Sequence, residues 1–190
     1  MLIPVILYVI TVTVYGLLNS DDILLLASLY ISLDIPYEAA ELIQRETKKG
    51  TVIVDEKSVL LLARSWHQAR ELDKAAISYA TLAKLEKGGK AYFHQGQVYM
   101  EMQQWKLAAI ALQNALDKGI DQRKGRAYLL LGVVRYEMNQ LAAAKQALKG
   151  AVETVSIKMA AHNSGFTKWK TANRSLLCFV KSTCIPIVVH

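Results

Sequence analysis

The chain has 190 residues, of which 53% are hydrophobic and 21% are charged, a composition too apolar for a disordered protein. Three prolines and ten glycines are too few for the dense turns of a β-sandwich or barrel, so we expect an all-α protein. Its two cysteines, Cys178 and Cys184, suffice neither for a disulfide framework nor for a zinc ligand set, and they do not identify the cellular compartment.

The net charge of +7 is unevenly distributed along the chain. Residues 1–55 have 3 basic and 7 acidic side chains, residues 56–122 have 9 and 7, and residues 123–190 have 11 and 2. A basic C-terminal third can face nucleic acid, anionic lipid or an acidic peptide, but its Lys and Arg residues are separated by apolar ones. This spacing favours a solvated basic face over a nucleic-acid site.

The first expected element is an uncharged segment, Met1–Leu18, which reaches the lower length limit for a membrane-spanning helix. No Lys or Arg precedes Arg45, so the positive flank that orients a signal peptide or an anchor is missing. We therefore predict an apolar helix over residues 1–19, which either anchors the protein in a membrane or packs as a cap on the helices that follow. The first alternative favours a membrane-associated or periplasmic location over a cytoplasmic one.

Pairs of small residues twelve positions apart recur four times after this segment. The pairs are Ala27/Ala39, Ala63/Ala75, Gly96/Ala108 and Gly132/Ala144, and they begin 36, 33 and 36 residues after one another. This is the period of a helical-hairpin repeat. Large apolar residues lie at fixed distances from each pair, so two antiparallel helices can approach closely while large side chains fill the gaps around them.

The spacing predicts four repeats, at about residues 20–55, 56–88, 89–124 and 125–156 of an array that spans 20–156. The helices are expected at 21–32 and 37–48, 56–70 and 72–86, 89–102 and 105–118, and 123–138 and 141–154. Gly50, Gly88–Gly89 and Gly119 are expected to end second helices in the left-handed conformation. Beyond the array, residues 157–190 lose the pattern and are expected to form a partial capping helix and an irregular tail.

The pattern resembles the tetratricopeptide repeat of bacterial proteins, in which an aromatic residue, Leu-Gly and Tyr in the first helix precede Ala and a large apolar residue in the second. The third repeat resembles it best, with Tyr92, Gly96, Tyr99, Ala108 and Leu112. The resemblance implies a right-handed α-solenoid of about four antiparallel helix-turn-helix repeats. Aromatic residues at repeat positions are expected to fill its core rather than to stack on bases or hold a cofactor.

The resemblance also implies a function, because the first helices of such arrays line a concave groove that holds a peptide or helix of a protein partner. The predicted groove residues lie on one face of these helices: Lys57, Leu60, Arg64, His67, Lys90, Phe93, Gln97, Met100, Arg126, Leu129 and Tyr136. Basic and apolar groups are mixed among them, so we expect an acidic and apolar partner. The sequence contains no motif for catalysis, phosphate binding or metal binding, so we expect a non-enzymatic interaction scaffold without cofactor or metal.

Two alternative functions stay open at this point. The Ala-rich repeats look like those of bacterial envelope proteins, so with Met1–Leu18 in a membrane the chain would be an envelope assembly or transport accessory protein. Binding of nucleic acid by the basic C-terminal third is the other alternative, and it would weaken steeply with salt. No small-molecule substrate is expected, and neither the partner nor the oligomeric state follows from the sequence.

Overall fold

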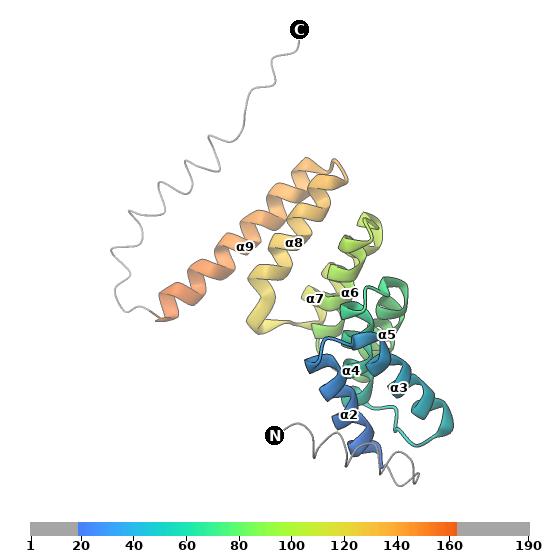
Figure 1. Ribbon diagram of the computed structural model, residues 1–190. Helices are drawn as coiled ribbons and strands as arrows, with labels where there is room; N and C mark the ends of the chain where they lie inside the picture. The colour runs from blue at the N-terminus through green and yellow to red at the C-terminus, as the bar shows by residue number, and fades with distance from the viewer. Residues whose placement is uncertain (1–18, 163–190) are drawn as a thin grey trace.

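The protein is all α, and the computed structural model describes residues 19–162. Within them eight α-helices form four successive antiparallel pairs (Figure 1). The pairs are α2 (Ser20–Ser32) with α3 (Pro36–Lys49), α4 (Glu56–Gln68) with α5 (Leu72–Leu85), α6 (Lys90–Glu101) with α7 (Trp105–Lys118), and α8 (Lys124–Glu137) with α9 (Leu141–His162). A single 3-10 turn, η1 (Asp121–Arg123), precedes α8. Each pair packs on the next, so that α2–α3 and α8–α9 are the two ends of the array.

The helices begin and end within two residues of the predicted bounds, except for the last one. We expected α9 to end at residue 154 and a separate capping segment to begin near residue 157, but α9 continues to His162. Gly150 does not interrupt the helix, because the ring of Tyr128 occupies the space beside it: an added Cβ would lie 3.1 Å from Tyr128 Cδ1. Packing of that ring offsets the low helix propensity of glycine.

Two predictions concern segments at the ends of the chain. The apolar helix of residues 1–19 falls almost wholly outside the described residues, and so does the irregular tail over 163–190. Between residues 19 and 162, no helix combines the length and the apolarity needed to cross a membrane.

The small residues twelve positions apart lie where the two helices of a pair touch. Ala27 and Ala39 are fully buried, as are their equivalents in the second pair. At Gly96 an added Cβ would lie 2.8 Å from Leu112 Cγ, and at Gly132 one would lie 2.7 Å from Leu148 Cδ2. These distances are shorter than a normal carbon–carbon contact, so the glycines allow an approach that a larger residue would prevent. The predicted role of the small pairs is confirmed.

The turn inside each hairpin has one conformation in all four repeats. A single non-glycine residue at the same repeat position has a positive φ, between 56° and 63°: Asp34, Arg70, Gln103 and Asn139. The next residue then donates its amide to a carbonyl five residues earlier, as Gln104 N does to Tyr99 O at 2.8 Å. This is the six-to-one bond of the Schellman motif, which satisfies the carbonyls at the end of the first helix.

The ends of the second helices differ more than expected. Gly50 has the predicted left-handed conformation with φ 81°, whereas Gly119 combines a positive φ of 89° with an extended ψ of 121°. The prediction for Gly88–Gly89 is wrong, because Gly89 has φ −94°. Gly89 is required for space instead: its amide donates to Gly119 O at 3.0 Å, and an added Cβ would lie 2.9 Å from the Cα of Ala115.

Buried side chains form three clusters, each of which joins one hairpin to the next. The largest side chains within them are aromatic: Trp66 is 1% exposed, Tyr79 2% and Phe93 1%. Trp66 and Tyr79 therefore fill the core as predicted, whereas Phe93 was expected to line the groove. Because each cluster needs the following hairpin, an internal hairpin is buried on both sides only within the stack.

Candidate functional site

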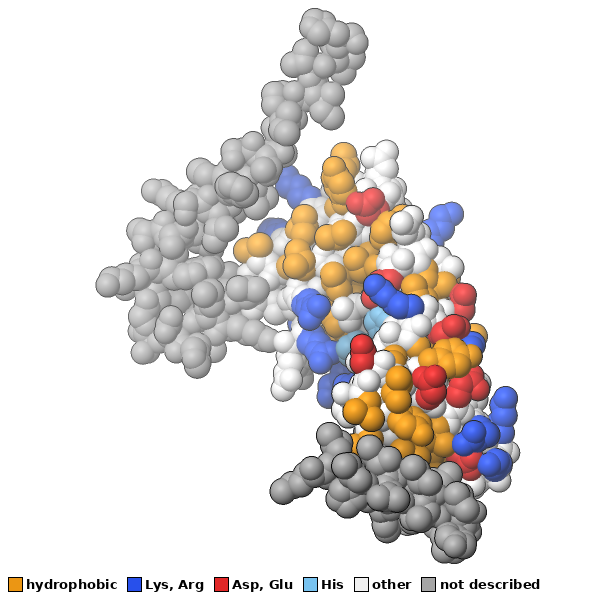
Figure 2. All heavy atoms as spheres, in the orientation of Figure 1, with side chains coloured by type: hydrophobic (Ala, Val, Ile, Leu, Met, Phe, Trp, Pro, Cys, Tyr) orange, Lys and Arg blue, Asp and Glu red, His pale blue; other side chains and the backbone are white. Residues whose placement is uncertain are grey.

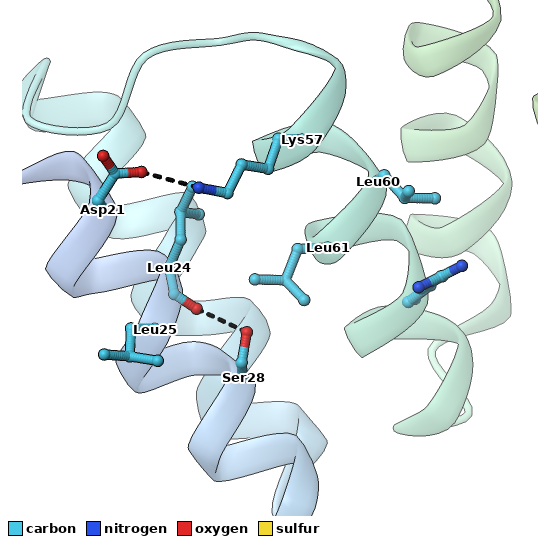
Figure 3. Close-up of a pocket in the computed structure, with 8 residues that line it drawn as sticks. Asp21, Leu24, Leu25, Ser28, Lys57, Leu60 and Leu61 are labelled. Atoms are coloured by element: carbon cyan, nitrogen blue, oxygen red, sulfur yellow. Dashed lines mark hydrogen bonds and ion pairs between the residues drawn. The ribbon is translucent and has the colours of Figure 1, made fainter. Parts of the chain in front are cut away.

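We call the groove face the side of α2, α4, α6 and α8 on which the predicted groove residues lie. Between α2 and α4 this face holds a pocket of about 310 Å³ (Figure 3). Its lining comes from equivalent positions on the two helices: Asp21, Leu24, Leu25 and Ser28 on α2, and Lys57, Leu60, Leu61 and Arg64 on α4. The leucines make the pocket apolar, and the charged side chains lie at its two ends.

The charged pair at one end of the pocket is Asp21 and Lys57. Lys57 Nζ donates to Asp21 Oδ1 at 2.8 Å, and this bond raises the pKa of the Lys57 ammonium. Both side chains are largely exposed, so the pair adds little to stability. The pair shows that residues at one repeat position meet between neighbouring hairpins, because Asp21 and Lys57 occupy the same repeat position on neighbouring first helices.

Further along the groove face, His94 of α6 is the centre of a polar network. Its ring stacks on that of Tyr79 in α5, with centroids 5.5 Å apart and an angle of 21° between the planes. His94 Nε2 lies 2.8 Å from a guanidinium nitrogen of Arg123, and Nδ1 lies 3.1 Å from Gln97 Oε1. Because a guanidinium can only donate, Nε2 accepts this bond, and Nδ1 carries the proton donated to Gln97.

Burial decides the charge of this network. It lowers the pKa of His94 to about 4, and the positive charge of Arg123 acts in the same direction, so the imidazole is neutral at pH 7. Burial also raises the pKa of Tyr79 to about 12, which keeps the phenol protonated. The positive charge here therefore belongs to the arginines and not to the histidine.

Three cations of the groove face, and Arg123 of η1 beside it, have no carboxylate partner among the described residues; the three are Arg64, Lys90 and Arg126. The guanidinium carbons of Arg123 and Arg126 lie 5.7 and 5.9 Å from the ring centre of Phe93. Both distances suit a cation–π interaction. Figure 2 shows basic side chains beside histidine and exposed apolar groups on one face of the array.

The structure places the predicted groove residues in three groups. Exposed side chains are those of Lys57, Arg64, Lys90, Arg126, Leu129 and Tyr136, and partly buried ones are those of Leu60, His67, Gln97 and Met100. Phe93 is buried, with 1% of its surface exposed, so a partner at the surface does not reach it. The physical reason is that its position faces the following hairpin, where Arg123 of η1 and Arg126 of α8 lie over the ring.

His67 has a local partner at the edge of the groove face. Its Nε2 lies 2.8 Å from Glu101 Oε1, while Arg70 donates to the other carboxylate oxygen at 2.7 Å. Glu101 is thus shared by two basic groups of the preceding hairpin. Among the side chains that the structure describes, no three of His, Cys, Asp or Glu gather as a metal site would require.

Sequence reasoning missed His94, Tyr79 and Arg123 as members of the site. A signal existed for His94, because the other repeats have leucine at its position: Leu25, Leu61 and Leu130. A polar group at a position that is otherwise apolar indicates a local partner. Arg123 offered no such signal, because it lies in the connection between two repeats.

No known family model and no curated protein matches the chain. Solved structures do match it: a crystal structure of MamA, a bacterial tetratricopeptide-repeat protein, superposes with a TM-score of 0.66 at 20% identity, covering 75% of this chain and 81% of that one. A second MamA structure gives a TM-score of 0.67 at 20% identity, with 77% and 78% covered. This chain has a tetratricopeptide-repeat fold.

A MamA fragment from residue 41 to the end, from Desulfovibrio magneticus RS-1, extends the match to 87% of this chain and 97% of that one. The identity is 16% and the TM-score 0.61. At this level of identity the likeness is one of fold, so the tetratricopeptide-repeat resemblance of the sequence is confirmed as an arrangement of helices. Function has to be argued from this chain's own surface.

Proposed function

We propose that this chain is a non-enzymatic scaffold that binds a segment of a protein partner along its groove face. Stacked hairpin repeats offer extended surfaces of this kind. The observation that carries the proposal is the composition of the groove face: an apolar pocket between α2 and α4 is followed by cations that lack carboxylate partners among the described residues.

The partner segment is acidic and apolar. An apolar side chain of the partner enters the pocket and contacts Leu24 and Leu60. Arg64 lines the same pocket and lies near enough to His94 to influence its pKa, so a carboxylate beside the apolar anchor meets this guanidinium. Electrostatic complementarity of this type sets the direction and register of a bound segment more than its affinity.

Two features support a protein partner over nucleic acid. Single-stranded nucleic acid binds by stacking bases on exposed aromatic faces. Here the rings of Trp66, Tyr79 and Phe93 are at most 2% exposed. The exposed rings of Tyr37 and Tyr136 lie on α3 and α8, in the first and last hairpins, so they do not form one platform.

The test is a peptide-display selection on the immobilised full chain, followed by calorimetric titration of the enriched peptides. We expect enrichment of sequences in which Asp or Glu lies close to Leu, Ile or Phe. Arg64→Glu should weaken their binding about 10-fold or more, because the substitution brings like charges together. A matched control is Lys106→Glu, which makes the same charge change at an exposed position on α7, a second helix.

Both variants should keep the wild-type helicity, since both side chains are exposed and have no ion-pair partner among the described residues. A selection that enriches no peptide class, or binding that Arg64→Glu and Lys106→Glu weaken equally, would contradict the assignment of the groove face.

A further inference from the structure

The C-terminal end of the array exposes apolar side chains that are buried at an internal junction. Leu129 is 48% exposed and Leu148 is 38% exposed. Their equivalents in the third repeat are Phe93 and Leu112, which are 1% and 0% exposed because α8 and α9 follow. We call Leu129 and Leu148 the tail face, since both lie where a fifth hairpin would pack.

The N-terminal end shows the complementary feature. Leu25 is 61% exposed and Leu33 is 49% exposed. Their equivalents in the fourth repeat are Leu130 and Met138, which pack against the buried cluster of the third hairpin. Leu33 therefore lies on the side where a preceding hairpin would pack, and Leu25 lies at the edge of that side, where it also lines the pocket between α2 and α4. We call Leu25 and Leu33 the head face.

Internal junctions show how a head face meets a tail face. His94 has the repeat position of Leu25, Tyr79 has that of Leu148, and the rings of His94 and Tyr79 stack. A junction built in the same way brings Leu25 of one copy onto Leu148 of another. It also brings Asp21 of one copy close to Arg126 of another. Asp21, Lys57 and Arg126 share one repeat position, and two residues at this position, Asp21 and Lys57, already form an ion pair between α2 and α4.

Charge favours this junction over contact between two like ends. Residues 19–50 contain six acidic and three basic side chains, whereas residues 123–154 contain two acidic and six basic ones. An acidic head and a basic tail attract each other, and two heads or two tails repel. The positive charge of residues 123–154 also disfavours residues 163–190 as the cover of the tail face, because that segment contains basic but no acidic side chains.

We propose that copies of this chain associate head to tail, with α2–α3 of one copy packed on α8–α9 of the next. The contact is heterologous, because two different surfaces meet, so each complex retains one free head and one free tail. Assembly is therefore open-ended and continues the stacking of hairpins from one copy to the next.

The first test is sedimentation velocity of the full chain over a range of concentrations. We expect the average mass to rise at least twofold with concentration and to fall when salt is raised from about 50 mM to about 1 M, because salt screens the opposed charges. A chain that stays monomeric at every concentration would overturn the proposal. That is the result expected if the chain's own ends or another partner covered both faces.

The second test uses variants that each block one face. Leu33→Lys places a positive charge on the head, opposite the basic tail, and Leu129→Glu places a negative charge on the tail, opposite the acidic head. Each variant alone should be monomeric with wild-type helicity by circular dichroism. A one-to-one mixture should form a dimer and nothing larger, because only the intact tail of Leu33→Lys and the intact head of Leu129→Glu can still join.

The mixture separates head-to-tail contact from other kinds of self-association. A symmetric contact, either between two like ends or between two groove faces, predicts that the mixture behaves like the separate variants, and that result would overturn the proposal, as would self-association of either variant alone. If one variant loses helicity, Leu25→Lys replaces it on the head face and Leu148→Glu on the tail face, with the same expected outcome.

Discussion

The ring of His94 lies nearly parallel to the ring of Tyr79, 5.5 Å away, and joins the second hairpin to the third. Elsewhere these two repeat positions hold aliphatic residues, such as Leu130 and Leu112. The junction is therefore polar only at this place, and it stays neutral because burial lowers the pKa of His94 to about 4. The neutral ring is what permits Arg123 to approach at 2.8 Å.

This junction should make stability depend on pH below neutrality. Unfolded His94 binds a proton near its ordinary pKa of about 6.5, whereas folded His94 does so only near 4, so the unfolded state binds more protons between these values. The free energy of unfolding should therefore fall by about 1–2 kcal/mol between about pH 7 and 5. Urea unfolding followed by circular dichroism at several pH values measures this fall.

The control for the pH experiment is His94→Leu, which restores the residue found at this position in the other three repeats. The two proteins share every other ionisable group, including Arg64 and Arg123, which face His94, so the difference in pH dependence isolates the contribution of His94. Equal pH dependence in the two proteins would show that His94 is not held neutral by the fold.

Gly89→Ala should destabilise the protein by about 2–3 kcal/mol. The new Cβ would lie 2.9 Å from the backbone of Ala115, and backbone cannot move aside as a side chain can. Gly88→Ala is the neighbouring control, because its Cβ would lie 3.9 Å from Gly119 O, in ordinary contact. Thermal unfolding compares the two, and similar losses in both would contradict the close approach of α6 to α7.

Gly96→Ala and Gly132→Ala should differ although the two glycines share one repeat position. Each new Cβ meets a leucine side chain at less than 3 Å, Leu112 in the first case and Leu148 in the second. Leu112 is fully enclosed, so Gly96→Ala should cost about 1–2 kcal/mol. Leu148 is 38% exposed and can move, so Gly132→Ala should be neutral or slightly stabilising through better helix propensity.

Both changes can be measured by urea unfolding at one pH. An equal loss of stability in the two variants would mean that Leu148 is held as firmly as Leu112. Packing of Leu148 in the head-to-tail junction would also hold its side chain in place, so the comparison is made at a concentration where the chain is monomeric.

Gln103→Gly should stabilise the protein by about 0.5–1 kcal/mol. Gln103 has φ 56°, which costs a residue with a Cβ more than it costs glycine, and its exposed side chain makes no hydrogen bond. Gln104→Gly, one residue later at φ −84°, should instead lower stability, because it only increases the backbone freedom of the unfolded chain. The unfolding midpoint in urea should move in opposite directions for the two variants.

The sequence by itself determined the helical hairpins and their order. The contact between two neighbouring helices requires small residues at positions such as Ala63 and Ala75, so their spacing is visible in the sequence. Helix bounds follow for the same reason, since caps such as Asn19 and Asp55 act within one turn of the helix that they begin. These are local requirements, and local requirements leave a periodic pattern.

Only the tertiary structure decided which first-helix residues are available to a partner. Phe93 and Leu129 have the same repeat position and both were predicted to face the groove, but one is buried and the other exposed. The difference comes from the hairpin that follows Phe93, and from Arg123, which reaches His94 from outside the repeated positions. Exposure and charge pairing depend on neighbouring hairpins, and the pattern within one repeat does not contain them.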